Sequence, residues 1–229
     1  MGTRHPRIYV ITIDGPAGAG KSTIARKLAA RLKIFYLDTG SMYRALTLKA
    51  IQNRVNLEDE EALVRLARKT VIDLKMDDRQ LLRIFLDGCD VSSQIRSVDV
   101  TNKTFYIARA PGVREIMVQW QRNIGGKQSC VVEGRDAGTV IFPKAAVKFY
   151  LDADIEERCR RRIEELRSQG RTVDEASLKA ELKERDTKDM TRSVGPLKKA
   201  DDAIPIDSTN MSVEQVVSKM LSLIGVEEG

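Results

Sequence analysis

The chain has 229 residues, of which 42% are hydrophobic and 31% charged, and its formal net charge is +6. This length suits one α/β domain with insertions and is too short for two large domains. No apolar run approaches the ~20 residues of a membrane-spanning helix, and the N-terminal segment lacks the apolar centre of a signal peptide. We therefore expect a cytoplasmic protein without a membrane partner.

Histidine and cysteine chemistry is not expected. The three cysteines are widely spaced, which favours neither a disulfide framework nor a zinc site. The single histidine, His5, lies in a polar tail, so acid/base catalysis by histidine is not expected either. The positive charge suits a polyanionic partner, but aromatic residues make up only 5% of the chain and do not alternate with basic ones. We expect phosphate-bearing small molecules rather than a stable nucleic-acid partner.

The first elements enclose the strongest motif of the sequence. An apolar run from Ile8 to Ile13 predicts a buried strand ending at Asp14, and a helix is predicted from Ser22 to about Leu32. Between them lies G-x-x-x-x-G-K-[ST], where glycines allow a tight turn and the helix N-terminus attracts anions. Lys21 can reach the terminal phosphates of a nucleotide, and the Ser22 hydroxyl can bind Mg²⁺. The predicted phosphate-binding residues are Gly15, Pro16, Ala17, Gly18, Ala19, Gly20, Lys21, Ser22 and Thr23.

The next elements are a short strand at 35–37, a helix from Ser41 to about Asn53 and another from Glu58 to Lys69. Arg44 then falls in the first turn of its helix, where a cation is unfavourable unless an anion compensates it. Either an anionic partner lies nearby or Arg44 is a solvated surface residue.

A small antiparallel sheet is predicted next. Residues 71–76 and 82–86 alternate between apolar and polar, 76–80 form a hairpin turn, and 88–91 supply a third short strand. Helices are predicted at 98–110 and 112–123, separated by Pro111. This part of the chain is interpreted as an insertion into an α/β fold.

The C-terminal part returns to the α/β pattern. Short apolar runs at 130–132, 146–151 and 203–206 predict parallel strands, whose carboxyl ends carry the site in open α/β sheets. The segment from Glu156 to Arg192 contains eight arginines and two predicted charged helices, and a last helix spans 212–224. Most of these arginines are interpreted as solvated and paired with acids. Two sets share a helical face, Arg158 with Arg161 and Arg162, and Arg185 with Asp189 and Arg192.

With these motifs in view, the sequence closely resembles bacterial cytidylate kinases, which are nucleoside monophosphate kinases of the P-loop group. The matching stretches are 13–23, 37–44, 131–143, 151–162 and 183–197, and the resemblance extends from Ile8 to about Ile224. It implies a P-loop NTPase fold, α/β with a five-stranded parallel core sheet flanked by helices. It also implies one domain, with a core at about 1–38, 112–157 and 185–229, a monophosphate-binding insert at 39–111 and a lid at 158–184.

The resemblance implies phosphoryl transfer from ATP, with Mg²⁺, to CMP or dCMP. It assigns Arg44, Arg114, Arg135 and Arg192 to the acceptor's phosphate, the pair Arg185 and Asp189 to cytosine, and Asp38 or Thr39 to the sugar. It also places Tyr43, Thr101 and Asp136 in the acceptor site. The catalytic residues that it implies are Lys21, Arg135, Arg158, Arg162 and Arg192.

One position departs from the family pattern. Phe105 stands where the family usually has a serine that contacts the base, so Thr101 or Thr104 would have to supply the hydroxyl, or one hydrogen bond is missing.

Two other functions remain as alternatives. The first is a kinase of the same fold for UMP, AMP, a sugar or a shikimate-like acid. The second is a nucleotide-driven switch or nucleic-acid translocase, although the chain shows neither a guanine-specifying motif nor a helicase motif set. No assembly stripe is evident, so a monomer is expected.

Overall fold

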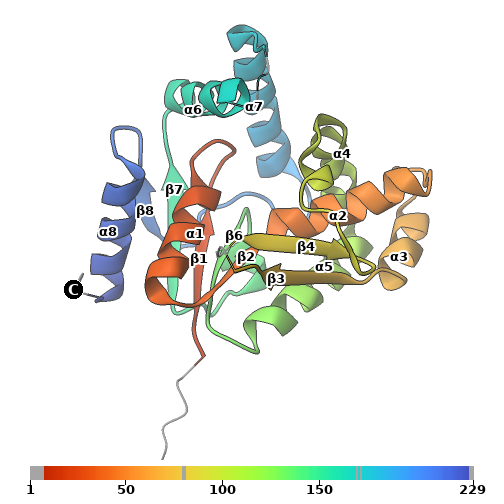
Figure 1. Ribbon diagram of the computed structural model, residues 1–229, viewed down its shortest axis with the longest axis horizontal. Coiled ribbons are helices and arrows are strands. Elements are labelled where there is room, and N and C mark those ends of the chain that lie inside the picture. The colour runs from red at the N-terminus through yellow and green to blue at the C-terminus, as the bar shows by residue number, and fades with distance from the viewer. Residues whose placement is uncertain (1–7, 79–80, 169, 171, 227–229) are drawn as a thin grey trace, which may run out of the picture. The chain divides into compact units, whose positions relative to one another are not determined.

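The computed structural model describes residues 8–78, 81–168, 170 and 172–226 (Figure 1). The chain forms two compact units. The first comprises the chain up to Phe35 and from Gln128 onward, and the second comprises Tyr36–Lys127. In the described part of the chain, every helix is too short or too polar to cross a membrane.

The first unit is built on a five-stranded sheet with the strand order β2-β6-β1-β7-β8. Strand β1 pairs in parallel with both β6 and β7, and β7 pairs in parallel with β8. The predicted parallel α/β core is therefore confirmed. The strands are β1 (Val10–Asp14), β2 (Phe35–Asp38), β6 (Cys130–Gly134), β7 (Val147–Asp152) and β8 (Ile204–Asp207).

The register of the central strands sets the position of the site. Asp14, the last residue of β1, lies opposite Gly134 of β6 and Tyr150 of β7. The loops that follow β1 and β6 therefore begin at the same edge of the sheet. This is the carboxyl edge, where open α/β sheets bind their ligands.

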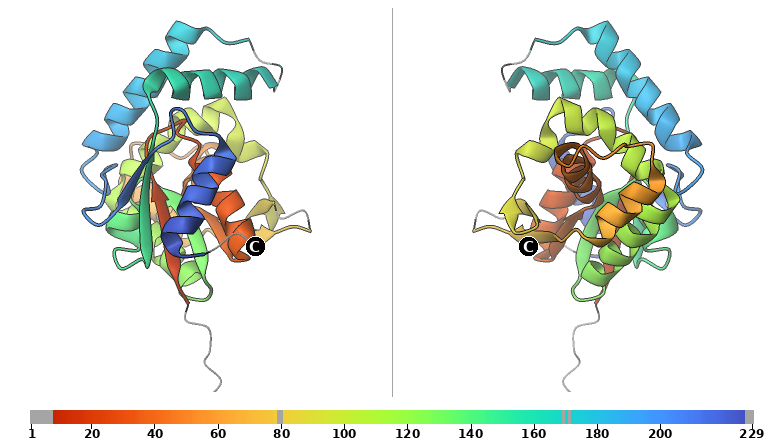
Figure 2. Two further views of the ribbon diagram at one scale, coloured as in Figure 1. Left: turned by 90° about the vertical axis from the view of Figure 1, so that its left-hand side faces the viewer. Right: turned by 90° about the vertical axis from the view of Figure 1, so that its right-hand side faces the viewer.

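The α-helices in the described part of the first unit are α1 (Lys21–Leu32), α6 (Ile155–Ser168), α7 (Glu175–Thr191) and α8 (Val213–Ile224). Helix α1 packs on β1 and β6 and against α8. Helices α6 and α7 pack against each other (Figures 1 and 2) around Cys159, Ile163, Leu178 and Leu182. Ala17, from the loop after β1, belongs to the same buried cluster.

The second unit combines helices with the predicted antiparallel sheet, which is confirmed with the order β3-β4-β5. The hairpin turn at 76–80 lies partly outside the described residues. The core joins Ala45 and Leu48 of α2 to Ile84 and Leu86 of β4. The elements are α2 (Thr39–Gln52), α3 (Glu60–Arg68), β3 (Ile72–Met76), β4 (Leu82–Leu86), β5 (Cys89–Asp90), the 3-10 helix η1 (Gln94–Arg96), α4 (Val98–Arg109) and α5 (Pro111–Gly125).

Helix α2 begins at Thr39, two residues before the predicted start at Ser41. The reason is local, because the Asp38 carboxylate accepts a hydrogen bond from the Ser41 backbone N–H at 2.8 Å and so caps the helix. Arg44 consequently lies in the second turn, and the prediction that placed it in the first turn was wrong. Its guanidinium has an anionic partner nonetheless, since Nη2 lies 2.8 Å from the Asp38 carboxylate.

Candidate active site

The loop after β1 has the shape of a phosphate cradle. Gly15 has φ +152°, and a Cβ atom on it would lie 1.9 Å from the Leu151 carbonyl oxygen. Gly18 has φ +78°, and a Cβ atom there would press against the backbone of Arg158. Only glycine allows the loop to lie this close to its neighbours. Helix α1 begins directly after Gly20, so its N-terminal N–H groups and its dipole favour an anion at this loop.

Lys21 is buried at the start of α1, and its Nζ donates to the Pro16 carbonyl oxygen at 2.6 Å. Burial, and after it the positive charge of Arg135, lower the pKa of Lys21 to about 7. An ammonium group in such a place is poorly stabilised by the protein alone. A polyphosphate would supply the missing negative charge.

Two of the acid–arginine pairs in the described part of the first unit join residues predicted for the acceptor site. Nε of Arg135, which follows β6, donates to Asp189 of α7 at 2.7 Å, and Nη2 of Arg192 lies 3.5 Å from Asp136. Burial opposes the charge on Asp189, but Arg135 and Arg185 outweigh it and lower its pKa. Burial likewise disfavours the charged form of Arg135, but Asp189 outweighs this effect and raises its pKa. Both partners of the Arg135–Asp189 pair are thus held in their charged forms.

Asp14 was not among the predicted site residues, yet it holds the loop that carries Arg135 and Asp136. Its carboxylate accepts hydrogen bonds from the backbone N–H groups of Ala137 and Gly138, at 2.8 and 2.7 Å. These residues open a π-helical turn, Ala137–Ile141 (η2). Turns of this kind are rare and frequently occur at functional sites. Burial raises the pKa of Asp14 to about 6.

The predicted lid arginines have different surroundings. Arg158 is buried, and its Nη1 donates to the Ala17 carbonyl oxygen at 3.0 Å and to Asp186 at 2.5 Å. Arg162 is partly exposed and pairs with Glu165 of the same helix at 2.6 Å. Arg161, between them in the sequence, donates to the Ser208 carbonyl oxygen at 2.6 Å. The structure therefore does not bring Arg158 and Arg162 together at one point.

The second unit groups five of its predicted residues around the start of α2. Asp38 caps the helix and pairs with Arg44, as described above. The Arg114 side chain is buried and lies over the Tyr43 ring, with Cζ 5.6 Å from the ring centroid. Thr39 is buried at the first position of the helix. The Nε atom of Arg44 is buried without a hydrogen-bond partner among the described residues, so this guanidinium retains a donor for a ligand.

The side chains at and near Phe105, the position where the family usually has a serine, already have partners within the protein. The Thr101 and Thr104 hydroxyls donate to the carbonyl oxygens of Ser97 and Val100, one helical turn earlier, at 2.9 and 2.7 Å. The Phe105 ring lies against the Arg109 guanidinium, 5.4 Å from centroid to Cζ. To replace the missing serine, a threonine hydroxyl would have to accept a hydrogen bond from the base while it donates to its carbonyl oxygen. Otherwise it would have to give up that hydrogen bond and donate to the base.

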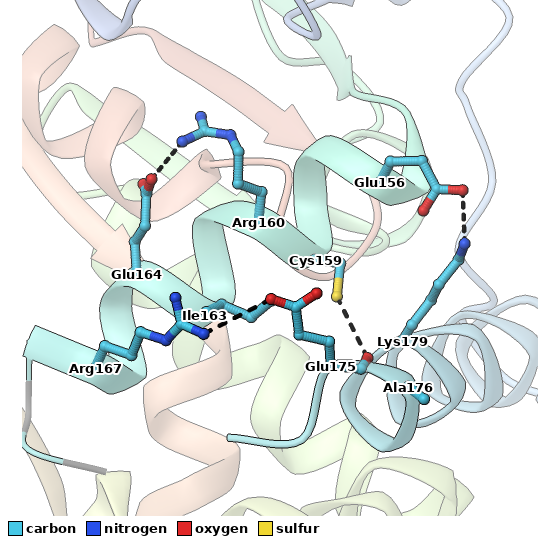
Figure 3. A pocket seen from close by; sticks show the side chains of 9 residues that line it. All are labelled: Glu156, Cys159, Arg160, Ile163, Glu164, Arg167, Glu175, Ala176 and Lys179. Carbon is cyan, nitrogen blue, oxygen red and sulfur yellow. Dashed lines mark hydrogen bonds and ion pairs between the residues drawn. The ribbon is translucent and has the colours of Figure 1, made fainter. Parts of the chain in front are cut away.

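A cleft of about 420 Å³ lies between α6 and α7 (Figure 3). Its charges are paired across and along the helices, Glu156 with Lys179, Arg160 with Glu164, and Arg167 with Glu175. None of the predicted substrate residues lines it. The lining residues are Glu156, Cys159, Arg160, Ile163, Glu164, Arg167, Glu175, Ala176 and Lys179.

Asp186 is the second residue that was not predicted. It is buried on α7, and its carboxylate accepts from the Ala17 backbone N–H at 3.1 Å. The sequence contains a signal for this burial, because Leu178, Leu182 and Asp186 are spaced four apart and share one helical face. An acid in line with two buried leucines indicates a carboxylate with a fixed partner in the protein.

Comparison with known proteins agrees with these features. Residues 11–225 match the family model described as cytidylate kinase. The chain is 48% identical over 214 residues to the cytidylate kinase of Desulforamulus reducens, covering 93% of this chain and 96% of that protein. It is 49% identical to the cytidylate kinase of Pelotomaculum thermopropionicum, covering 93% and 95% of the two chains.

Solved structures support the fold alone. A gluconokinase from Sinorhizobium meliloti 1021 aligns with a TM-score of 0.50 at 10% sequence identity, covering 95% of this chain and 92% of that one. An uncharacterized protein from Eubacterium ventriosum aligns with a TM-score of 0.51 at 15% identity, covering 96% and 99%. Because the family model spans nearly the whole described sequence and the relatives share almost half of their residues with it, the chain belongs to the cytidylate kinase family of nucleoside monophosphate kinases.

Proposed function

We propose that the chain transfers the terminal phosphoryl group of ATP to CMP or dCMP, yielding ADP and CDP or dCDP. Membership of the cytidylate kinase family supports this reaction. The observation that carries it is that Asp14, the last residue before the phosphate loop, holds the loop of Arg135 and Asp136 through hydrogen bonds from the Ala137 and Gly138 N–H groups, at 2.8 and 2.7 Å. The loop that binds the donor phosphates and the loop that carries an acceptor-site arginine thus begin at one edge of the sheet, as a reaction between two phosphates requires.

The donor half of the site consists of the phosphate loop and Lys21. Backbone N–H groups at the start of α1 bind the phosphates of ATP, and Lys21 neutralises charge that develops on the transferred group. Ser22 lies exposed in the first turn of α1. Its hydroxyl oxygen fits a Mg²⁺ ion, which prefers oxygen donors and supplies charge neutralisation when bound to nucleotide phosphates. Arg162, with its guanidinium on a partly exposed face of α6, contacts ATP when the lid closes.

The acceptor half consists mainly of arginines. Arg44, Arg114, Arg135 and Arg192 bind the phosphate of CMP, each with a planar guanidinium that can donate two hydrogen bonds. The acceptor oxygen is a phosphate oxygen that is largely ionised near neutral pH, so no general base is required. The buried, unpartnered Nε of Arg44 supports this role, because a phosphate oxygen would satisfy it.

The remaining residues of the acceptor site bind the nucleoside. Arg185 and Asp189 recognise cytosine, and Asp38 or Thr39 binds the sugar. Tyr43, Thr101 and Asp136 complete the surroundings of the acceptor. We place the protein in the cytoplasm as a monomer with no stable nucleic-acid partner.

The test is a measurement of ADP formation with ATP and Mg²⁺ and a panel of acceptors: CMP, dCMP, UMP, AMP, shikimate and unphosphorylated cytidine. We expect steady turnover with CMP and dCMP and very little with cytidine, which lacks the phosphate that the arginines bind. Preferred use of AMP, UMP or shikimate would assign the protein to another small-molecule kinase activity. Turnover without acceptor that rises on addition of RNA or DNA would contradict the kinase assignment.

A further inference from the structure

Ala17 of the phosphate loop is held from three directions by the two helices α6 and α7. Its backbone N–H donates to Asp186 Oδ1 at 3.1 Å, and its carbonyl oxygen accepts from Arg158 Nη1 at 3.0 Å. Its methyl group is buried among Cys159, Leu178 and other apolar residues of the α6–α7 pair. Both backbone polar groups of one loop residue are therefore satisfied by side chains of these two helices, Arg158 at the start of the predicted lid at 158–184 and Asp186 just after its end.

The two side chains that hold Ala17 also bind each other. Arg158 Nη1 lies 2.5 Å from Asp186 Oδ2, and each side chain is only 9% exposed. Arg158 Nε donates in addition to the Ala153 carbonyl oxygen at 3.0 Å, just before α6 begins. A buried ion pair repays its desolvation only with good geometry and further hydrogen bonds, and this pair has both. The Arg158 guanidinium is thus fixed by three protein oxygens.

The neighbouring Gly18 shows how closely the loop and α6 are packed. A Cβ atom on Gly18 would lie 3.1 Å from the Arg158 carbonyl oxygen and 3.2 Å from its Cβ atom. The first turn of α6 thus lies directly against the loop. A change in the position of this turn would move the backbone that cradles the phosphates.

We propose that Arg158 and Asp186 are positioning residues that set the conformation of the phosphate loop through Ala17. Asp186 fixes the orientation of the Ala17 peptide, and Arg158 joins that peptide to α6. On this assignment Arg158 acts on ATP through the loop backbone and does not touch the transferred phosphoryl group. The assignment rests on the proposed use of ATP, and it replaces the expectation that Arg158 is itself catalytic.

The binding of ADP separates the two roles, because ADP lacks the phosphoryl group that is transferred. Loss of a positioning residue weakens ADP and ATP alike, since both depend on the shape of the loop. Loss of a residue that contacts the transferred group leaves ADP affinity intact and lowers kcat. The variants are Arg158→Met, Asp186→Asn and the double variant, with Arg167→Met as the matched control. Arg167 also lies on α6 but is 62% exposed and pairs with Glu175.

We expect each single variant to weaken ADP and ATP, measured by calorimetry, by ~10-fold or more, the loss typical of a hydrogen bond to a charged group. The affinity of the double variant for ADP and ATP should lie within about threefold of that of the weaker-binding single variant, because both changes break one network. The control should bind as wild type does. Unchanged ADP affinity in Arg158→Met with a large fall in kcat, or effects that multiply in the double variant, would overturn the proposal.

A second measurement needs no variant and no kinase activity. In the nucleotide-free wild type, the Ala17 backbone N–H should exchange with solvent at least ~10-fold more slowly than an open loop amide, because Asp186 occupies it. Rapid exchange at Ala17 would overturn the proposal even if the enzyme phosphorylates CMP. Failure to phosphorylate CMP would overturn the proposed function instead, and would leave the exchange result standing.

Discussion

The surroundings of Lys21 favour the binding of an anion. Its ammonium is buried, bound to the Pro16 carbonyl oxygen and close to the positive charge of Arg135. Each of these features except the carbonyl contact disfavours the charged lysine in the absence of an anion. The site is therefore electrostatically complementary to a polyphosphate. Without a bound anion, the charged form of Lys21 is disfavoured.

Replacing Lys21 with alanine should lower kcat by at least ~100-fold, about 2.7 kcal/mol of transition-state stabilisation, because charge on the transferred phosphoryl group is no longer neutralised. The measurement is steady-state turnover with saturating CMP and ATP. Lys27→Ala is the control, since Lys27 lies on the same helix, is exposed and pairs with Glu214. Near wild-type turnover in a folded Lys21→Ala protein would remove Lys21 from the mechanism.

Asp189 should decide which base is accepted. Its Oδ2 accepts from Arg135, and we expect Oδ1 to accept from the exocyclic amino group of cytosine, with Arg185 donating to the base. Uracil presents a carbonyl oxygen at the position of this amino group and would leave buried polar groups unpaired. Such pairing can discriminate by as much as ~10⁴-fold, and we expect less here because Phe105 lacks the serine hydroxyl.

Asp189→Asn should narrow the preference for CMP over UMP, mainly by impairing the use of CMP. The measurement is kcat/KM for CMP, dCMP and UMP on both proteins. Equal use of CMP and UMP by the wild type, or full discrimination by the variant, would refute the assignment of Asp189 to base recognition.

A sequence motif predicts the role of single residues when the residues that act together are also close together in the sequence. The phosphate loop could be predicted because its residues are contiguous and each has a chemical reason. Asp14 and Asp186 were not, because their partners are 124 and 169 residues away in the chain. Their burial could be suspected from the sequence, but the identity of the groups they bind depends on tertiary packing.

Among the elements, the π-helical turn η2 depends on one carboxylate. Asp14 accepts from two successive N–H groups of this turn, and burial raises its pKa from 3.8 to about 6. Because the pKa is higher in the folded protein than in the unfolded chain, the stability associated with Asp14 is complete below pH 3.8. This contribution to the free energy of unfolding is lost as the pH rises through about 6. The full pKa shift of Asp14 corresponds to a loss of about 3 kcal/mol.

The variant Asp14→Asn removes this titration. We expect the difference in unfolding free energy, Asn variant minus wild type, to become more positive between pH 4 and pH 7.5 by up to about 3 kcal/mol. Any loss of hydrogen bonding to the asparagine is independent of pH and cancels in this comparison. The measurement is urea denaturation of both proteins at each pH, with Asp201→Asn as an exposed control. A difference that does not change with pH would show that Asp14 ionises without cost in the folded protein.

The elements themselves were mostly predictable, and the errors have local causes. The alternation of apolar residues predicted β3 and β4, and Pro111 predicted the break between α4 and α5. The helix was predicted to start at Ser41, whereas the Asp38 carboxylate caps a helix that starts at Thr39. A cap is defined by the hydrogen bond that it accepts, and several neighbouring residues of this sequence could have made one.

At the scale of the whole molecule, the charge of +6 is spread over a chain of two compact units, and the helices α6 and α7 are its most highly charged pair. Most of their arginines pair with acids on the surface. Arg158 differs, because it is buried at the phosphate loop and pairs there with the buried Asp186. This distribution is expected of a lid that is anchored at one end and hydrated over the rest of its surface.

Hydrogen exchange over the whole chain should reveal this lid. With a non-hydrolysable ATP analogue and CMP bound, α6 and α7 should gain protection, and the gain should be larger at their distant ends than near Arg158 and Asp186, which are already held. Helix α8 is the internal reference, because it packs on α1 and should change little. Equal protection of α6 and α7 with and without nucleotides would contradict a moving lid.

The burial of Ala17 in the α6–α7 core has a consequence for how such kinases can be recombined. A lid transplanted from a relative brings its own apolar residues at the positions of Cys159, Leu178 and Leu182. Unless residue 17 is exchanged with them, the graft meets a loop shaped for a different surface, and the chimera loses nucleotide affinity without any change to a nucleotide-contacting side chain. We therefore expect that the phosphate loop and the α6–α7 pair have to be exchanged together, although 140 residues of other sequence separate Ala17 from Arg158.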